Sequence, residues 1–190
     1  MKNLFLLLFL ACAVGAAQKP NVILVMVDDL GRDWVSCYGA KHQTPNLDRL
    51  AKEGVRYETA WSMPIGTPTR VTLLTGQYPF RHGWTTHYDV PRQGGGGFRP
   101  DRFTTFARTL RDNGYSTVIG GKWQLNHLGK QPNALKEHGF DEHCVWPGAE
   151  AGKPETEPRY WKGFLQANGK RGATAYGPYS INEYLINFIE

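Results

Sequence analysis

Three groups of residues in this chain have the types and spacing that anion or metal chemistry requires. The first is Gly66-Thr67-Pro68-Thr69-Arg70, which precedes a short apolar run and Gly76. Thr67 and Pro68 suit the start of a helix, and Gly76 suits its end. Amides at the helix start and the Arg70 guanidinium would together attract a sulfate or phosphate group. An ordinary capped helix with a solvated arginine is the alternative interpretation.

The second group is the acid pair Asp28-Asp29, which follows the unbroken apolar run Asn21–Val27. Such a run predicts a strand buried on both faces of a parallel sheet, and α/β sheets bind ligands at the carboxyl ends of their strands. Adjacent carboxylates repel each other, and a hard divalent cation such as Ca²⁺ or Mg²⁺ compensates them most simply. A solvated Asp-Asp turn is the alternative.

The third group is Lys122 with its neighbours. A helix is predicted over 103–113, with Thr104 or Thr105 as its cap, and a strand over 115–119. Lys122 follows that strand, so its ammonium would face the same sheet edge as the acid pair. A lone lysine on the surface is the alternative interpretation.

The elements that position these groups alternate along the chain. Further helices are predicted over 44–54 and 179–190, and a short strand over 55–60. His82 and His87 lack the paired spacing of a zinc site and are predicted to be structural or exposed. Exposed loops are predicted over 91–100 and 148–158. Three later aromatic residues either cover the core, which we favour, or stack on sugars: Tyr160, Trp161 and Phe164.

Together these motifs resemble the sulfatase family. The family signature Cys/Ser-x-Pro-x-Arg, a short apolar helix and Thr-Gly are similar to residues 66–76 at every position but the first. Gly120-Gly121-Lys122-Trp123 and Gly139-Phe140-Asp141 are similar to later family motifs, which lie in the same order. The resemblance implies a doubly wound, mostly parallel α/β sheet with helices on both faces, of the alkaline-phosphatase type. It also implies that residues 18–190 are the amino-terminal portion of a longer catalytic domain.

The resemblance implies a role for each matching residue. Asp28 and Asp29 would bind Ca²⁺ or Mg²⁺, Lys122 would contact the sulfate, and Arg70 would orient the nucleophile. In the family that nucleophile is a formylglycine made from cysteine or serine. Gly66 occupies its position and has no side chain to oxidise, so formylglycine cannot form there. Gln124 stands where the family usually has histidine, and an amide cannot carry a proton near neutral pH.

The implied function is a sulfuric ester hydrolase that acts on an aryl or carbohydrate sulfate with a divalent cation, impaired by the glycine at position 66. One alternative is a non-catalytic relative that binds metal and anion. Another is a phosphoester hydrolase that uses metal-bound water and needs no side-chain nucleophile.

The first residues of the chain and its composition indicate where the protein is located and what it binds. Residues 1–17 are predicted to be a signal peptide, with Lys2 before an apolar stretch and small residues before Gln18. Cleavage and lipidation at Cys12 is the alternative. The mature chain is therefore predicted to be periplasmic or secreted, without a transmembrane segment. Cys37 and Cys144 are expected to be unpaired.

The formal net charge is +5, and removing Lys2 with the signal peptide leaves +4. No basic run or aromatic-interleaved basic stripe accompanies this charge, so a nucleic-acid partner is not expected. An anionic substrate, either small or polymeric, is compatible with it. The sequence does not specify the particular ester or the oligomeric state.

Overall fold

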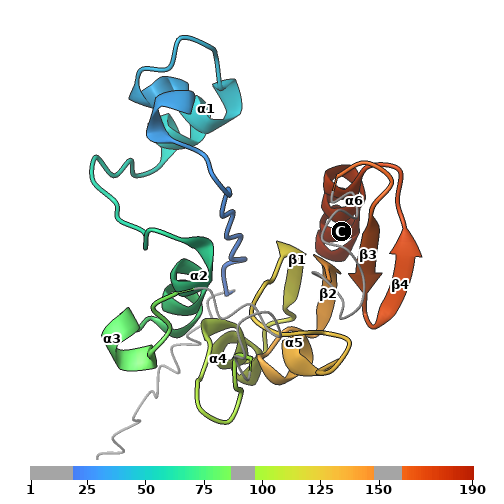
Figure 1. Ribbon diagram of the computed structural model, residues 1–190. Coiled ribbons are helices and arrows are strands. Elements are labelled where there is room, and N and C mark those ends of the chain that lie inside the picture. Colours follow the sequence, from blue (N-terminus) through green and yellow to red (C-terminus); the bar gives the residue numbers. More distant parts are fainter. Residues whose placement is uncertain (1–18, 87–96, 148–159) are drawn as a thin grey trace, which may run out of the picture. The chain divides into compact units, whose positions relative to one another are not determined.

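The computed structural model describes residues 19–86, 97–147 and 160–190 (Figure 1). Contacts divide the chain into two units, Met1–Arg56 and Tyr57–Glu190, and each is described by itself. The predicted signal peptide with Cys12, His87, the glycines at 94–96 and the predicted loop over 148–158 lie outside the described residues.

The first unit contains two short 3-10 turns, η1 (Arg32–Trp34) and η2 (Ser36–Tyr38), followed by helix α1 (Pro45–Glu53). Proline at the first helical position confirms the predicted start of α1. The Thr44 hydroxyl accepts no hydrogen bond from the first amides of the helix. It instead accepts a 2.9 Å hydrogen bond from the Ser36 amide, and the Ser36 hydroxyl donates to Asp48 at 2.6 Å. These bonds tie η2 to α1.

Two predicted strands are wrong, because the structure has no strand over 21–27 or 55–60. The apolar side chains from Val22 to Val27 are 37–77% exposed. An apolar run becomes a strand only where a neighbouring strand completes its hydrogen bonds, and the described residues provide none for this run. Leu47 and Leu50 of α1 are also exposed.

The second unit holds the sheet. Its helices are α2 (Gly66–Thr75), α3 (Pro79–His82), α4 (Phe106–Asp112), α5 (Ala134–Glu137) and α6 (Gly177–Ile189). Its strands are β1 (Val118–Lys122), β2 (Glu142–Trp146), β3 (Phe164–Ala167) and β4 (Lys170–Ala173). The described sheet has the order β1-β2-β3-β4, in which β1 and β2 are parallel and the other pairs antiparallel. The architecture is thus a mixed sheet with helices, part of an α/β fold.

Some sequence predictions for the second unit agree with the structure. The Thr105 hydroxyl accepts a hydrogen bond from the Arg108 amide at 3.1 Å and caps α4. The predicted strand over 115–119 is found three residues later as β1, and the helix predicted over 179–190 is α6. The core prediction for Tyr160, Trp161 and Phe164 is wrong, because their exposed fractions are 62%, 69% and 36%.

Helix α6 packs on β1 and β2 beside the β3–β4 hairpin (Figure 1). A Cβ atom at Gly120 would lie 2.8 Å from side-chain atoms of both Ile181 and Leu185, so only glycine lets α6 approach β1 this closely. Helix α6 also contacts β2, where the Tyr184 hydroxyl donates a 2.6 Å hydrogen bond to Glu142. Together these contacts fix α6 against the sheet.

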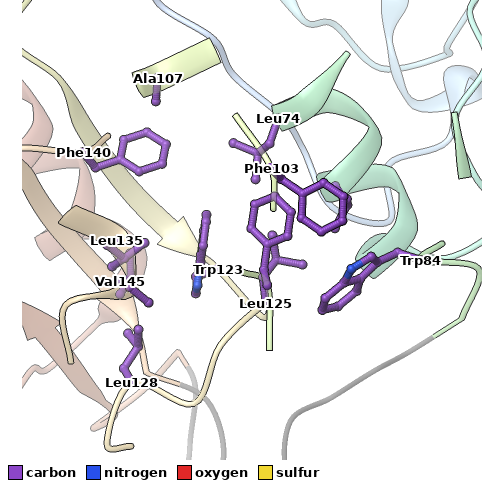
Figure 2. Packing of buried hydrophobic residues seen from close by; sticks show 13 residues of the cluster. Leu74, Trp84, Phe103, Ala107, Trp123, Leu125, Leu128, Leu135, Phe140 and Val145 are labelled. Carbon is purple, nitrogen blue, oxygen red and sulfur yellow. The ribbon is translucent and has the colours of Figure 1, made fainter. Parts of the chain in front are cut away.

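The hydrophobic core lies among α2, α4, α5, β2 and the segment that follows β1 (Figure 2). Trp123 is 2% exposed, and Phe98 and Leu125 are fully buried. The Phe98 ring stacks on His138 with centroids 4.2 Å apart and packs edge-on against Trp123. Because Trp123 directly follows β1, core packing fixes the chain at the end of that strand.

His138 makes the stability of this core depend on pH. Its Nε2 donates to the Phe98 carbonyl at 3.0 Å, and its Nδ1 has no hydrogen-bond partner among the described residues. Burial lowers the pKa of His138 to about 4, and Arg108 contributes in the same direction. In the unfolded chain the pKa is about 6.5, so between pH 6.5 and 4 the unfolded state binds more protons.

We therefore expect the free energy of unfolding to fall by about 2 kcal/mol between pH 7 and pH 5 through this group. Burial also lowers the pKa of His82 and His143, which act in the same direction. Urea denaturation followed by tryptophan fluorescence measures the change. His138→Gln should reduce the dependence of the unfolding free energy on pH, whereas His42→Gln, which replaces an exposed histidine, should not. The same dependence on pH in both variants would contradict the assignment of the effect to His138.

Candidate functional site

Helix α2 begins at Gly66, and its N-cap is Ile65 rather than the predicted Thr67. Thr67 and Pro68 are buried in the first turn, so the Thr67 hydroxyl does not serve as the N-cap group. The Thr69 hydroxyl donates back to the Ile65 carbonyl at 2.8 Å. Helix geometry leaves the first amides without intrahelical acceptors, which makes this terminus electropositive. The predicted end is confirmed, because Gly76 is left-handed with φ 65°.

Arg70 connects this helix to the end of β1. Its side chain is 9% exposed, and Nη1 donates a 2.8 Å hydrogen bond to the backbone carbonyl of Lys122. The bond therefore anchors the guanidinium beside the backbone of the predicted sulfate-contacting lysine. The structure thus brings Arg70 to the backbone of Lys122, and the roles of the two side chains in one site stay a prediction.

The chain turns sharply after Lys122, the last residue of β1. Gly121 has φ 98° and Gln124 has φ 60°, both in the left-handed region. For a non-glycine residue this conformation costs on the order of 1 kcal/mol, and it persists only where the surroundings fix it. Trp123, which lies between these two residues, is buried in the core. The turn places Lys122 and Gln124 on either side of a core residue, and both side chains are half-buried.

Asn126 is a positioning residue that the sequence analysis missed. Its Oδ1 accepts a 3.1 Å hydrogen bond from the indole of Trp123, and its Nδ2 donates to the Phe98 carbonyl at 2.9 Å and to Gln131 at 3.0 Å. Asn126 is 6% exposed, so its bonds to Trp123 and to the Phe98 carbonyl are shielded from water. The only sequence signal was its place immediately after the lysine motif.

Asp28 and Asp29 lie in the first unit, where both are exposed. Asp29 has φ 55°, an uncommon conformation for a non-glycine residue. Within the described ranges, no three His, Cys, Asp or Glu residues gather into a group that would hold a metal ion. The predicted metal site thus remains a prediction. The contact that the structure shows among the predicted site residues of the second unit is the bond from Arg70 to the Lys122 carbonyl; Gly66 begins the helix that carries Arg70, and Gln124 follows Lys122 by two residues.

The other reactive side chains have structural roles. His82 is 1% exposed, lies 3.0 Å from the Thr72 hydroxyl through Nε2, and accepts from the Trp84 amide through Nδ1 at 3.0 Å. This confirms the structural prediction for His82. Cys37 and Cys144 are both free thiols, as expected, and burial raises the pKa of the Cys144 thiol.

The site residues lie within a region that a known family describes. The family model for sulfatases matches residues 20–189. The chain belongs to the sulfatase family. It is 45% identical to human steryl-sulfatase over 133 residues, covering 66% of this chain and 23% of that protein. It is 38% identical to canine N-acetylgalactosamine-6-sulfatase over 155 residues, covering 77% of this chain and 29% of that protein. The chain thus spans about a quarter of these relatives' length.

Solved structures agree on the fold. One neighbour was determined in complex with its substrate D-glucosamine-2-N,6-O-disulfate; it has a TM-score of 0.72 and 29% identity over 90% of this chain and 31% of the other. A second, in complex with a neocarrahexaose, has a TM-score of 0.76 and 29% identity over 90% of this chain and 41% of the other. The fold is therefore the alkaline-phosphatase-like α/β fold of sulfatases, of which this chain covers a part.

This family generally depends on a divalent cation. Among the described residues, no helix combines the length and apolarity needed to cross a bilayer.

Proposed function

We propose that this protein binds a sulfate ester between the start of α2 and the end of β1, and that Gly66 prevents covalent hydrolysis of the ester. The observation that carries the proposal is the 2.8 Å bond from Arg70 to the Lys122 carbonyl. It joins the electropositive end of α2 to the strand end that carries the ammonium. A guanidinium fork and an ammonium suit the oxygens of a sulfate group.

Each residue would have one task. Lys122 would pair with a sulfate oxygen, and Arg70 would hold the start of the helix in position beside the end of β1. Covalent catalysis needs an activated nucleophile at residue 66, which glycine cannot supply. Gln124 would donate a hydrogen bond without transferring a proton.

We further propose that Asp28 and Asp29 contribute to a divalent-cation site. Their donor set fits, because hard carboxylate oxygens are what Ca²⁺ and Mg²⁺ bind. Since Ca²⁺ takes six to eight oxygen ligands, two carboxylates would form only part of the shell. A bound cation would act as a Lewis acid that polarises an oxygen coordinated to it. The signal-peptide pattern of residues 1–17 supports export of the mature protein.

A carbohydrate sulfate is the ester class that we favour. Two structural neighbours are complexes with a sulfated glucosamine and a neocarrahexaose, and a relative is named for N-acetylgalactosamine 6-sulfate. These descriptions apply to those proteins, and we extend them to this chain as a proposal.

Binding without turnover tests the proposal. Calorimetry on the full-length gene product with 4-nitrophenyl sulfate should detect binding, while nitrophenol release stays at the buffer rate. Lys122→Ala should raise Kd about tenfold or more, because a hydrogen bond between charged groups contributes about 1.5–3 kcal/mol. The control is Lys130→Ala, which removes an exposed lysine and should leave Kd within about twofold. Equal Kd values for the two variants, or no binding by the unaltered protein, would refute the proposal.

A further inference from the structure

We propose that Asn126 sets how tightly the proposed site holds its anion, because it keeps the turn after β1 in a left-handed conformation and thereby keeps Lys122 in place. Asn126 acts through Trp123 and not on the ligand, so it is a positioning residue. The inference rests on the proposed function, since the placement of the Lys122 ammonium affects affinity only if that ammonium pairs with the anion.

The turn that follows β1 is fixed at both of its ends. The Lys122 carbonyl, at the start, accepts the 2.8 Å hydrogen bond from Arg70. The Leu125 carbonyl, at the end, accepts a 2.9 Å hydrogen bond from the Phe98 amide. Gln124 lies between them with φ 60°, a conformation that costs a non-glycine residue free energy and persists only where its surroundings fix it. The turn is therefore a strained segment between two anchored carbonyls.

Asn126 connects the two sides of this turn through one side-chain amide. Its Oδ1 accepts from the indole of Trp123, the residue before Gln124, at 3.1 Å. Its Nδ2 donates at 2.9 Å to the carbonyl of Phe98, the residue whose amide holds Leu125. Trp123, Phe98 and Asn126 are 2%, 0% and 6% exposed, so water is a poor substitute for the asparagine amide.

Phe98 gives Asn126 a rigid anchor. Its carbonyl also accepts a hydrogen bond from His138 Nε2 at 3.0 Å, and its ring stacks on the His138 ring with centroids 4.2 Å apart. The His138 carbonyl in turn accepts from the hydroxyl of Thr105, which caps α4. The hydrogen bonds thus run from a helix of the core to the turn, and Asn126 is the link between Phe98 and Trp123.

Asn126→Ala is expected to raise the Kd for 4-nitrophenyl sulfate about tenfold in the full-length gene product. Without the amide, Gln124 can return to the right-handed conformation, which displaces Lys122. If about one molecule in ten keeps the competent turn, the apparent Kd rises by the inverse of that fraction. Calorimetry measures the change.

Trp123→Phe tests the path from Asn126 to the turn. It removes the indole donor and keeps an aromatic ring in the core, so it should also raise this Kd. Because both substitutions remove the same hydrogen bond, the double variant should bind within about twofold of the weaker single variant. If the two single effects multiply in the double variant, the path through Trp123 is wrong.

Two control variants separate positioning from a general loss of stability. Gln131→Ala removes the other acceptor of Asn126 Nδ2 and keeps the bonds to Trp123 and Phe98. Leu165→Ala removes packing in β3 at a residue that is 7% exposed and lies outside the hydrophobic cluster that contains Trp123. Both should keep Kd within about twofold. An unchanged Kd in Asn126→Ala, or an equal rise in Leu165→Ala, would overturn the inference.

Hydrogen exchange distinguishes this inference from the proposed function, because it needs no ligand. The peptide that contains Phe98, whose amide bonds to Leu125, should exchange about tenfold faster in Asn126→Ala than in the unaltered protein or in Leu165→Ala. Failure of 4-nitrophenyl sulfate to bind any of these proteins, with the faster exchange still present, would overturn the proposed function and support the hold of Asn126 on the turn. Unchanged exchange, with sulfate binding intact in the unaltered protein, would overturn the inference alone.

Discussion

Gly66→Cys, in the full-length gene product co-expressed with a formylglycine-generating enzyme, is expected to raise arylsulfatase turnover about a thousandfold or more over the unaltered protein. The reason is that covalent catalysis depends on the attacking atom, and removing an enzyme's nucleophile costs several orders of magnitude in turnover. Arg70 and Lys122 are already held beside each other by the bond to the strand end. The substitution would add the missing group to the proposed anion site. Release of nitrophenol from 4-nitrophenyl sulfate measures the gain.

Two controls test whether the gain in turnover depends on the oxidised side chain. Gly66→Ala adds a Cβ atom without an oxidisable group, and Gly66→Cys made without the generating enzyme keeps a thiol; both should remain at the background rate. Hydrolysis of 4-nitrophenyl sulfate by the unaltered protein with Gly66 would show that the prediction of impaired activity is wrong. Faster turnover of 4-nitrophenyl phosphate than of the sulfate would favour the metal-bound-water phosphoester hydrolase instead.

Gly139→Ala is expected to destabilise the second unit by more than about 4 kcal/mol. Gly139 has φ 99°, which side-chain-bearing residues rarely adopt. An added Cβ would also lie 2.2 Å from the Arg108 amide nitrogen and 2.7 Å from the Ala107 carbonyl carbon. These are backbone atoms of α4, so the clash is relieved only by moving the helix away from the core. Because domains are stable by only about 5–15 kcal/mol, much of the variant should be unfolded or insoluble.

Gly169→Ala is the matched control. Gly169 has φ 79°, but a Cβ atom there would meet nothing within 4 Å. It should therefore cost only the backbone strain, about 1–2 kcal/mol. Urea denaturation and soluble yield compare the two variants. Equal losses would mean that the close approach of Gly139 to α4 contributes nothing beyond its left-handed backbone.

Local sequence signals predicted the helices of this chain better than its strands. Glycine at the end of α2 and threonine at the start of α4 act within one turn, so Gly76 and Thr105 were readable without tertiary information. Strand β1 contains Gly120 and Gly121, which disfavour strands locally. Gly120 is there because α6 packs directly on it, a contact between segments about 60 residues apart in the chain that no local pattern reveals.

The candidate site was predicted in its residues but not in its contacts. The resemblance identified Arg70 and Lys122, yet the group that Arg70 binds is the backbone carbonyl of Lys122, which every residue type carries. Sequence therefore could not specify this bond. Thr67 looked like a cap because of its type, but Ile65 takes that position when the first turn is buried. The exposure of Trp161 was missed because aromatic residues suit both cores and binding surfaces.

The exposed run from Val22 to Val27 has a practical consequence for work with this chain by itself. Its side chains are 37–77% exposed, and it carries no charge and no proline. Such a segment offers its backbone groups to an identical segment on another molecule, as in cross-β assemblies. Light scattering of the isolated 190-residue chain should consequently rise with protein concentration. Dilute samples and mild denaturant during refolding are the conditions that would keep it monomeric.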